Sequence, residues 1–167
     1  MLEYPLLLVF PVAMVFAGAF DLLTMTIPNK ISLTLVVAFA LVATLSGLSI
    51  TAIAMHVGAS MIVLAAGFFL FIRGWLGGGD AKLLAASALW LGFDSLTQFL
   101  VLVGLLGGLL SGLILAFRVY VPDRLLHGPH WLLRLHGKGN GIPYGLAIAS
   151  AALLIYPETH WFAVLIG

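Results

Sequence analysis

Long apolar runs recur along the whole of this 167-residue chain, separated by short segments that hold the charged and turn-forming residues. A helix needs roughly 20 apolar residues to cross the hydrocarbon core of a bilayer. Six segments are candidates, of which the fourth and sixth are short: Tyr4 to Phe20, Ser32 to Ser49, Thr51 to Ile72, Ala81 to Phe93, Leu96 to Phe117 and Ile142 to Tyr156. The pattern predicts an all-α, polytopic membrane protein of about six transmembrane helices, forming one membrane-embedded domain over residues 1–167.

The composition agrees with this prediction. Hydrophobic residues make up 63% of the chain and charged residues only 8%, whereas a soluble domain averages about a quarter charged residues. The lipid bilayer is therefore the expected surrounding, and a net charge of +1 gives no reason to expect a nucleic-acid partner. The chain has no cysteine, which excludes disulfides, thiolate nucleophiles, zinc knuckles and iron–sulfur clusters.

The first apolar run has some features of a secretory signal. Leu6 to Phe16 is apolar, and Ala17-Gly18-Ala19 resembles a cleavage site. A signal peptide begins with positive charge, but here the first residues carry Glu3 and no Lys or Arg. We expect this run to remain as the first span.

The cations predict the orientation in the membrane. With six spans, the loops after the first, third and fifth share a side, and those loops and their flanks hold all seven Lys and Arg: Lys30, Arg73, Lys82, Arg118, Arg124, Arg134 and Lys138. Cytoplasmic loops are enriched in Lys and Arg, so this side should be cytoplasmic. Glu3, Asp94 and Glu158 fall on the other side. Both termini should therefore be outside.

The segment 118–141 is the one long loop and forms a basic cytoplasmic loop. Its cations and Trp131 favour a segment that lies on the anionic inner leaflet. Its three histidines, His127, His130 and His136, offer metal binding as an alternative, but their spacing matches no standard zinc motif. We expect no metal and no cofactor.

Two acidic residues carry the candidate chemistry. Asp21 closes the first span and Asp80 opens the fourth, so both should lie at the cytoplasmic boundary of the membrane. Ionisable groups at such a depth are costly and mark functional sites. Two facing carboxyls cannot both ionise easily, so one keeps its proton. The charged one activates a water and the neutral one polarises the scissile carbonyl of a peptide. The proton belongs to the pair, which leaves acid and base unassigned.

Gly77, Gly78 and Gly79 precede Asp80, and glycine there admits unusual backbone angles and the close approach of a substrate strand. The alternatives are a flexible turn for the glycines, a helix N-cap for Asp80 and a simple helix end for Asp21. Asp123 is the rival for a dyad partner, although its position before Arg124 also favours an N-cap.

These residues resemble those of the prepilin and preflagellin peptidases. Gly-Gly-Gly-Asp80 is similar to the GxGD motif of that family, which presenilin-type proteases share. Asp21 followed by Ile27-Pro28-Asn29 resembles the first catalytic segment, and Ile142-Pro143-Tyr144-Gly145 resembles the start of the last helix. The resemblance implies a membrane aspartic endopeptidase with Asp21 and Asp80 as its catalytic dyad. Gly77, Gly78, Gly79, Lys82, Pro28 and Asn29 would bind substrate or support the dyad.

By the same resemblance, the substrates are type IV pilin-like precursors. Their short basic leaders are cut off at the cytoplasmic face of a prokaryotic inner membrane, before a hydrophobic helix. Many larger relatives carry a zinc-binding cysteine motif and methylate the new N-terminus. This chain has no cysteine, so it resembles the short peptidases of Flp-type or tight-adherence pili, and we expect no N-methyltransferase activity.

Other features have two interpretations each. Lys82 either meets the dyad or substrate, or is a snorkelling anchor, and His56 is either a satisfied structural histidine or a functional one. Gly104, Gly108 and Gly112 form a smooth helix face, which we expect to pack within the bundle, with a homodimer contact as the alternative. For the whole protein, the rival functions are a small ion-coupled transporter and a non-catalytic assembly factor for a pilus or secretion machine.

Overall fold

The computed structural model describes residues 3–122, 124, 126–137 and 139–166, and every regular element in that part of the chain is helical. The predicted all-α class is therefore confirmed. In chain order the elements are α1 (Glu3–Leu7), α2 (Val9–Thr24), α3 (Asn29–Leu45), α4 (Ile50–Ile72), α5 (Gly78–Tyr120), α6 (His130–His136), α7 (Tyr144–Ile155), the 3₁₀ turn η2 (Tyr156–Glu158) and α8 (His160–Ile166).

Three of the described helical stretches are long and apolar enough to cross a membrane: Pro5–Thr24, Ile50–Ile72 and Gly78–Tyr120. The helices Asn29–Leu45 and Tyr144–Glu158 are apolar but shorter. Length and composition thus indicate an integral membrane protein.

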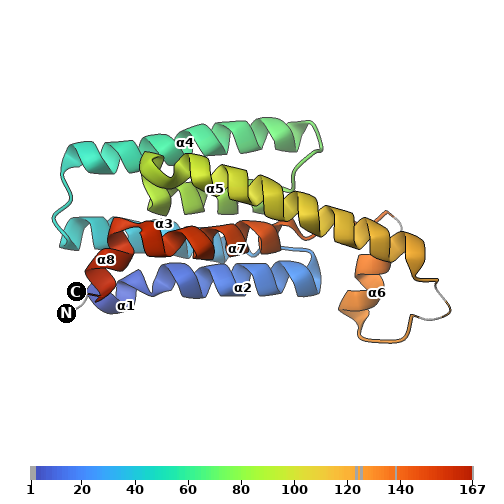
Figure 1. Ribbon diagram of the computed structural model, residues 1–167. Coiled ribbons are helices and arrows are strands. Elements are labelled where there is room, and N and C mark those ends of the chain that lie inside the picture. Colours follow the sequence, from blue (N-terminus) through green and yellow to red (C-terminus); the bar gives the residue numbers. More distant parts are fainter. Residues whose placement is uncertain (1–2, 123, 125, 138, 167) are drawn as a thin grey trace.

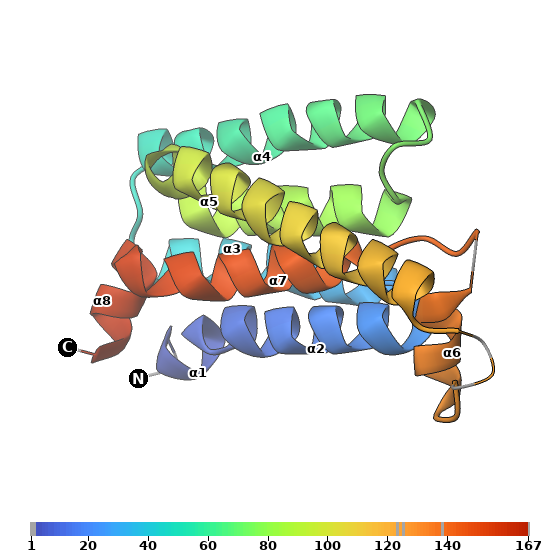
Figure 2. The same ribbon diagram turned by 45° about the vertical axis from the view of Figure 1, so that its right-hand side comes forward.

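Helix α5 is bent back on itself at Gly92, where φ is 65° and ψ is −175°. Both views show its ribbon reverse direction, so that two antiparallel halves lie on either side of this residue (Figures 1 and 2). The fourth and fifth predicted segments correspond to these halves. The predicted loop between them is wrong, because a single glycine makes the turn. Asp94, expected in that loop, is exposed in the first turn of the second half.

Helix ends follow from local sequence. Gly47 (φ 65°) and Gly74 (φ 72°) come just after α3 and α4. The N–H after each glycine bonds back to a helix carbonyl, Leu48 to Ala43 at 3.0 Å and Trp75 to Leu70 at 3.0 Å. Left-handed glycine is the usual residue for this ending.

The helices pack around the first half of α5 (Figure 1). Helices α3 and α4 each pack against α5, and α7 packs against both α2 and α5. Helices α1 and α8 touch each other at one end of the molecule, and α6 lies at the opposite end, beside the end of α5 (Figures 1 and 2).

Aromatic side chains hold the end near α1 and α8. Trp90 donates to Leu35 O at 2.9 Å, and Trp161 donates to Trp90 O at 2.6 Å. A ring nitrogen of His56 lies 2.8 Å from Leu89 O, and its ring contacts those of Phe39 and Trp161. These bonds satisfy polar groups in a low-dielectric core. The interpretation of His56 as a satisfied structural histidine is confirmed.

Small residues allow close helix contacts elsewhere. A methyl group at Gly18 would lie 3.2 Å from Ala149 Cβ, and one at Gly67 would lie 3.1 Å from Ala81 Cβ. The expectation that the face of Gly104, Gly108 and Gly112 packs within the bundle is wrong. No described atom lies within 4 Å of a methyl group built on any of the three, because this face points away from the other helices. Its homodimer contact remains a prediction.

The cations gather at the end of the molecule that carries α6. Lys30 and Lys82 lie in the first turns of α3 and α5, while Arg73 follows α4 and Arg118 lies in the last turn of α5. Figure 1 places all these helix ends on the same side. Lys138 lies outside the described residues. We refer to this end as the cationic end.

Candidate active site

Asp21 sits in the last turn of α2, at the cationic end. Its side chain is buried, only 5% exposed. The helix ends four residues later at Met25, a left-handed residue (φ 56°) whose N–H donates to Asp21 O at 2.8 Å. This ending turns the chain into the segment 25–29, which leads to α3. Asp21 is thus carried by the last turn of α2, and the segment 25–29 follows directly after it.

Asp80 is the third residue of α5 and not its N-cap, so the alternative interpretation of Asp80 as an N-cap is wrong. The N-cap position belongs to Gly77. From the third position a carboxylate can reach back to the N–H of the N-cap residue, and the Asp80 carboxylate interacts with the Gly77 amide in this way. Its other oxygen, Oδ1, is buried and has no hydrogen-bond partner among the described residues.

The structure brings Asp21 and Asp80 to the same place. Both line a cavity of about 520 Å³ and a second of about 290 Å³. The backbone N–H of Gly145, at the start of α7, donates to Asp21 Oδ2 at 2.6 Å, and the same amide interacts with the Asp80 carboxylate. Three helices, α2, α5 and α7, therefore converge on one pair of carboxyl groups.

The glycines around this pair are required for space. A methyl group at Gly77 would lie 2.7 Å from Asp80 Oδ2, and one at Gly145 would lie 2.8 Å from Asp21 Oδ2. A methyl group at Gly78 would lie 3.3 Å from the Phe71 ring, and one at Gly79 would lie 3.2 Å from Ile27 Cβ. The expectation that residues 77–79 adopt unusual backbone angles is wrong, because none of them has a positive φ.

Arg118 holds the wall of the larger cavity, which also includes the turn 74–77 and residues 140–142. Its Nε donates to Leu135 O at 2.7 Å, and its Nη2 donates to the carbonyls of Asn140 and Gly141 at 3.0 and 2.9 Å. These bonds fix the loop that leads into α7. From the sequence, Arg118 was expected only to contribute to orientation in the membrane, since nothing there marks it as a partner of that loop.

The segment 27–29 lines the smaller cavity through Ile27 and Asn29. Pro28 is the N-cap residue of α3, with extended backbone angles, and Asn29 begins the helix. Lys82 Nζ donates to Asn29 Oδ1 at 2.9 Å, which ties the first turn of α5 to that of α3. Lys82 and Pro28 do not line either of the two cavities.

The loop histidines do not form a cluster in the described part of the chain. His136 is buried, with a ring nitrogen 2.7 Å from Val121 O, and its ring packs on Phe117. His127 and His130 are exposed. No group of three His, Cys, Asp or Glu side chains able to hold a metal occurs among the described residues. Asp123, the rival dyad partner, lies outside them.

The fold and the site together define a helical membrane protein with two carboxyl groups at one cavity. The chain belongs to the type IV leader peptidase family, whose family model matches residues 8–112, more than half of the chain. That match includes both Asp21 and Asp80, while Gly145 lies beyond it. Comparisons with curated proteins and with solved structures give no match. Family membership supports a peptidase, and the family implies pilin-like precursors as substrates.

Proposed function

We propose that this peptidase is a membrane aspartic endopeptidase of the GxGD type, with Asp21 and Asp80 as its catalytic dyad. It removes the short basic leader from type IV pilin-like precursors at the cytoplasmic face of the inner membrane. Supporting roles go to Gly77, Gly78, Gly79, Pro28, Asn29 and Lys82.

One observation carries the proposal. Two acidic side chains 59 positions apart in the sequence line the same cavity at the cationic end, and one oxygen of Asp80 is buried there without a partner. Buried polar atoms nearly always have hydrogen-bond partners in folded proteins. An orphaned carboxylate oxygen at a cavity that is lined by a second carboxyl is suited to hold a water or a substrate atom.

The chemistry uses the two carboxyls in different states. An ionised carboxyl accepts a proton from water, and the resulting nucleophile attacks the scissile carbonyl carbon. A protonated carboxyl gives its proton to the carbonyl oxygen. The carboxyl that took the proton from water then protonates the leaving amine as the C–N bond breaks, and the first carboxyl recovers its proton from the diol. The shared proton belongs to the pair, so the two residues exchange roles over the cycle. The Gly145 N–H, which donates to Asp21 Oδ2, fixes the position of that carboxyl at the cavity.

For the membrane topology we propose six spans, formed by α2, α3, α4, the two halves of α5, and α7. The cationic end faces the cytoplasm, which the distribution of Lys and Arg supports, and both termini lie outside. The dyad then meets a precursor at the depth where its leader joins its hydrophobic helix. Because the chain has no cysteine, it lacks the zinc motif of larger relatives, and we propose no methyltransferase activity.

The test is cleavage of a co-expressed Flp-type pilin precursor, read by gel shift and by the mass of the new N-terminus. Wild type should process the precursor. Asp21→Asn and Asp80→Asn keep the shape of each side chain but remove its acid–base function, so each should lower the rate by at least about 100-fold. Asp94→Asn is the matched control, since Asp94 is an exposed acid far from the cavity.

The cleavage rates of wild type and the variants are compared at equal protein levels. Normal cleavage by either dyad variant would show that the dyad is misassigned, and Asp123→Asn would be tested next. Failure of wild type on several precursors would favour the transporter or the assembly factor.

A further inference from the structure

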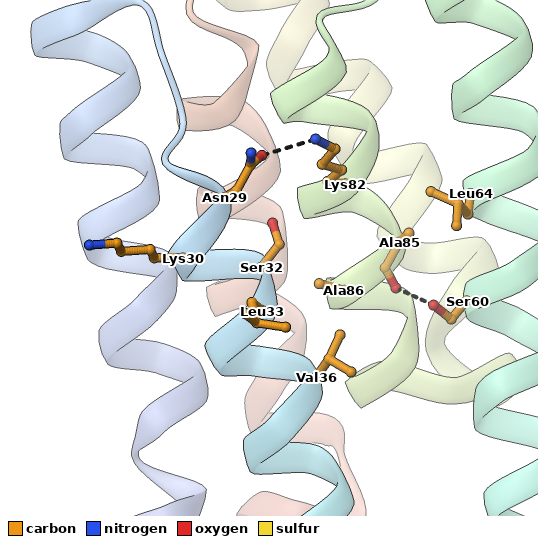
Figure 3. Close-up of a pocket in the computed structure, with 10 residues that line it drawn as sticks. All are labelled: Asn29, Lys30, Ser32, Leu33, Val36, Ser60, Leu64, Lys82, Ala85 and Ala86. Carbon is orange, nitrogen blue, oxygen red and sulfur yellow. Dashed lines mark hydrogen bonds between the residues drawn. The ribbon is translucent and has the colours of Figure 1, made fainter.

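A groove runs along the side of the bundle next to the candidate active site (Figure 3). It measures about 460 Å³, and three helices line it. Helix α3 contributes one face, with Asn29, Ser32, Leu33 and Val36 at helical spacing, and α4 contributes Ser60 and Leu64. The first half of α5 forms the floor between them with Ala85 and Ala86.

The groove has one closed end and one open end. One turn beyond Val36 and Ser60, the rings of Phe39 and His56 meet at 5.3 Å and join α3 to α4. At the other end stand Asn29 and Lys82, joined by their 2.9 Å hydrogen bond. Asn29 also lines the cavity that contains Asp21 and Asp80. The groove therefore adjoins the candidate active site at Asn29.

The chemistry of the groove changes along its length. The amide of Asn29, the ammonium of Lys82 and the hydroxyl of Ser32 lie at the end near Asp80 (Figure 3). Further along, the walls are formed by apolar side chains, and the Ser60 hydroxyl there is already bonded to Ala85 O at 2.8 Å. Leu33 is 63% exposed, Val36 44% and Leu64 37%. The small floor residues allow another helix backbone to approach closely. A segment that is polar where it leaves the active site and apolar from there on matches this order.

We infer that this groove binds the first two turns of the apolar helix of the substrate, directly after the scissile bond. This assignment rests on the proposed function and adds a substrate-binding site to it. From Asn29 to Val36 the groove follows α3 over seven residue steps, which is about 10 Å of helix rise. The Phe39–His56 contact ends it there, so the rest of the substrate helix continues beside the bundle in lipid. Lipid chains alone are the competing occupant.

Disulfide cross-linking tests the assignment, because the chain has no cysteine of its own. In membranes that contain the Asp80→Asn enzyme, Val36→Cys is paired with precursors that carry one cysteine at successive positions of the apolar helix. Val37→Cys is the matched control. Val37 is the next residue on α3, is 52% exposed, and faces a different surface hollow. Leu64→Cys tests the opposite wall.

We expect Val36→Cys and Leu64→Cys to cross-link to the first two turns of the substrate helix, and Val37→Cys to give little product. Equal cross-linking from Val36→Cys and Val37→Cys, or cross-links from Val36→Cys only to later turns, would overturn the groove and leave lipid as its occupant. Cleavage by the cysteine-free wild type is measured in parallel. Its absence would overturn the proposed function, and the groove assignment with it.

A second measurement does not depend on cross-linking. Val36→Trp should fill the groove and lower the cleavage rate by at least about tenfold, because displaced substrate loses its alignment with the dyad. Val37→Trp adds the same bulk one residue away and should leave the rate unchanged. Equal rates for the two variants, with equal protein levels and normal wild-type cleavage, would show that the groove does not hold substrate.

Discussion

At the scale of single residues, the site depends on how close backbone comes to the two carboxyl groups. The Gly145 N–H lies 2.6 Å from Asp21 Oδ2, and Gly77 leaves space for Asp80 Oδ2. Leaving a buried acceptor unpaired costs about 1–3 kcal/mol, and Asp80 Oδ1 is in that state. A cost of this kind, borne at a cavity, is typical of functional sites.

Gly145→Ala tests this close approach. The added methyl group would lie 2.8 Å from Asp21 Oδ2 and 2.6 Å from Ile27 Cδ1. The end of Ile27 can rotate away, but Asp21 is bonded to the Gly145 amide itself and must shift. A shift of about 1 Å at a catalytic group can lower a rate by about 100-fold. We expect a loss of that order in precursor cleavage.

The control for this variant is Gly141→Ala. Gly141 is also in the loop before α7 and lines the larger cavity, yet no described atom lies within 4 Å of a methyl group there. Its cleavage rate should stay close to that of wild type. A normal rate for Gly145→Ala would show that the dyad tolerates displacement of Asp21.

The two aspartates were predictable from the sequence, and Gly145 and Arg118 as site residues were not. Asp21 and Asp80 stand out because the chain has only six acids, most of them between apolar runs. Gly145 is one of 19 glycines, and its contribution is a backbone N–H, which every residue except proline carries. Arg118 acts through carbonyls about 20 positions later, a pairing that only the fold creates.

At the scale of elements, the site is assembled by helix ends. The last turn of α2 supplies Asp21, the first turn of α5 supplies Asp80, and the first turn of α7 supplies the Gly145 amide. Apolar periods predicted where the helices lie to within a few residues. They predicted a break at Asp94 and Ser95, but not that the chain reverses at Gly92 within an otherwise helical stretch, because a glycine inside an apolar run carries no polar signal.

Gly92→Ala tests that turn. With φ 65° and ψ −175°, Gly92 is in a region that essentially only glycine occupies, and forcing another residue there costs about 1–3 kcal/mol. A methyl group would also lie 2.9 Å from His56 Cε1, in a ring that is held by its bond to Leu89 O. We expect a clear fall in the thermal unfolding temperature in mild detergent.

Gly47→Ala is the comparison for this substitution. Gly47 has the same φ of 65°, but no described atom lies within 4 Å of a methyl group at that position. Gly47→Ala should lose stability through backbone strain alone. Its unfolding temperature should therefore fall less than that of Gly92→Ala. Equal unfolding temperatures would mean that the contact with His56 contributes nothing and that the turn relaxes.

At the scale of the whole molecule, charge and chemistry are found at the same end. The described cations flank the helix ends that carry Asp21 and Asp80, while Asp94 and Glu158 lie at the other end. An excess of Lys and Arg fixes the cytoplasmic side of a membrane protein. In the proposed topology, the distribution that orients the chain in the bilayer therefore also sets the side on which a precursor is cut.

This orientation predicts which single cysteines react with a membrane-impermeant maleimide added to intact cells. Glu158 and His127 are both exposed and lie at opposite ends of the molecule. Glu158→Cys should be labelled in intact cells, because η2 lies outside in the proposed topology. His127→Cys should be labelled only after the cells are permeabilised. Since the chain has no cysteine, the unsubstituted protein gives the background. The opposite labelling pattern would place Asp21 and Asp80 on the outer side, where a leader held in the cytoplasm cannot reach them. That result would contradict the cytoplasmic site of cleavage even if both residues are catalytic.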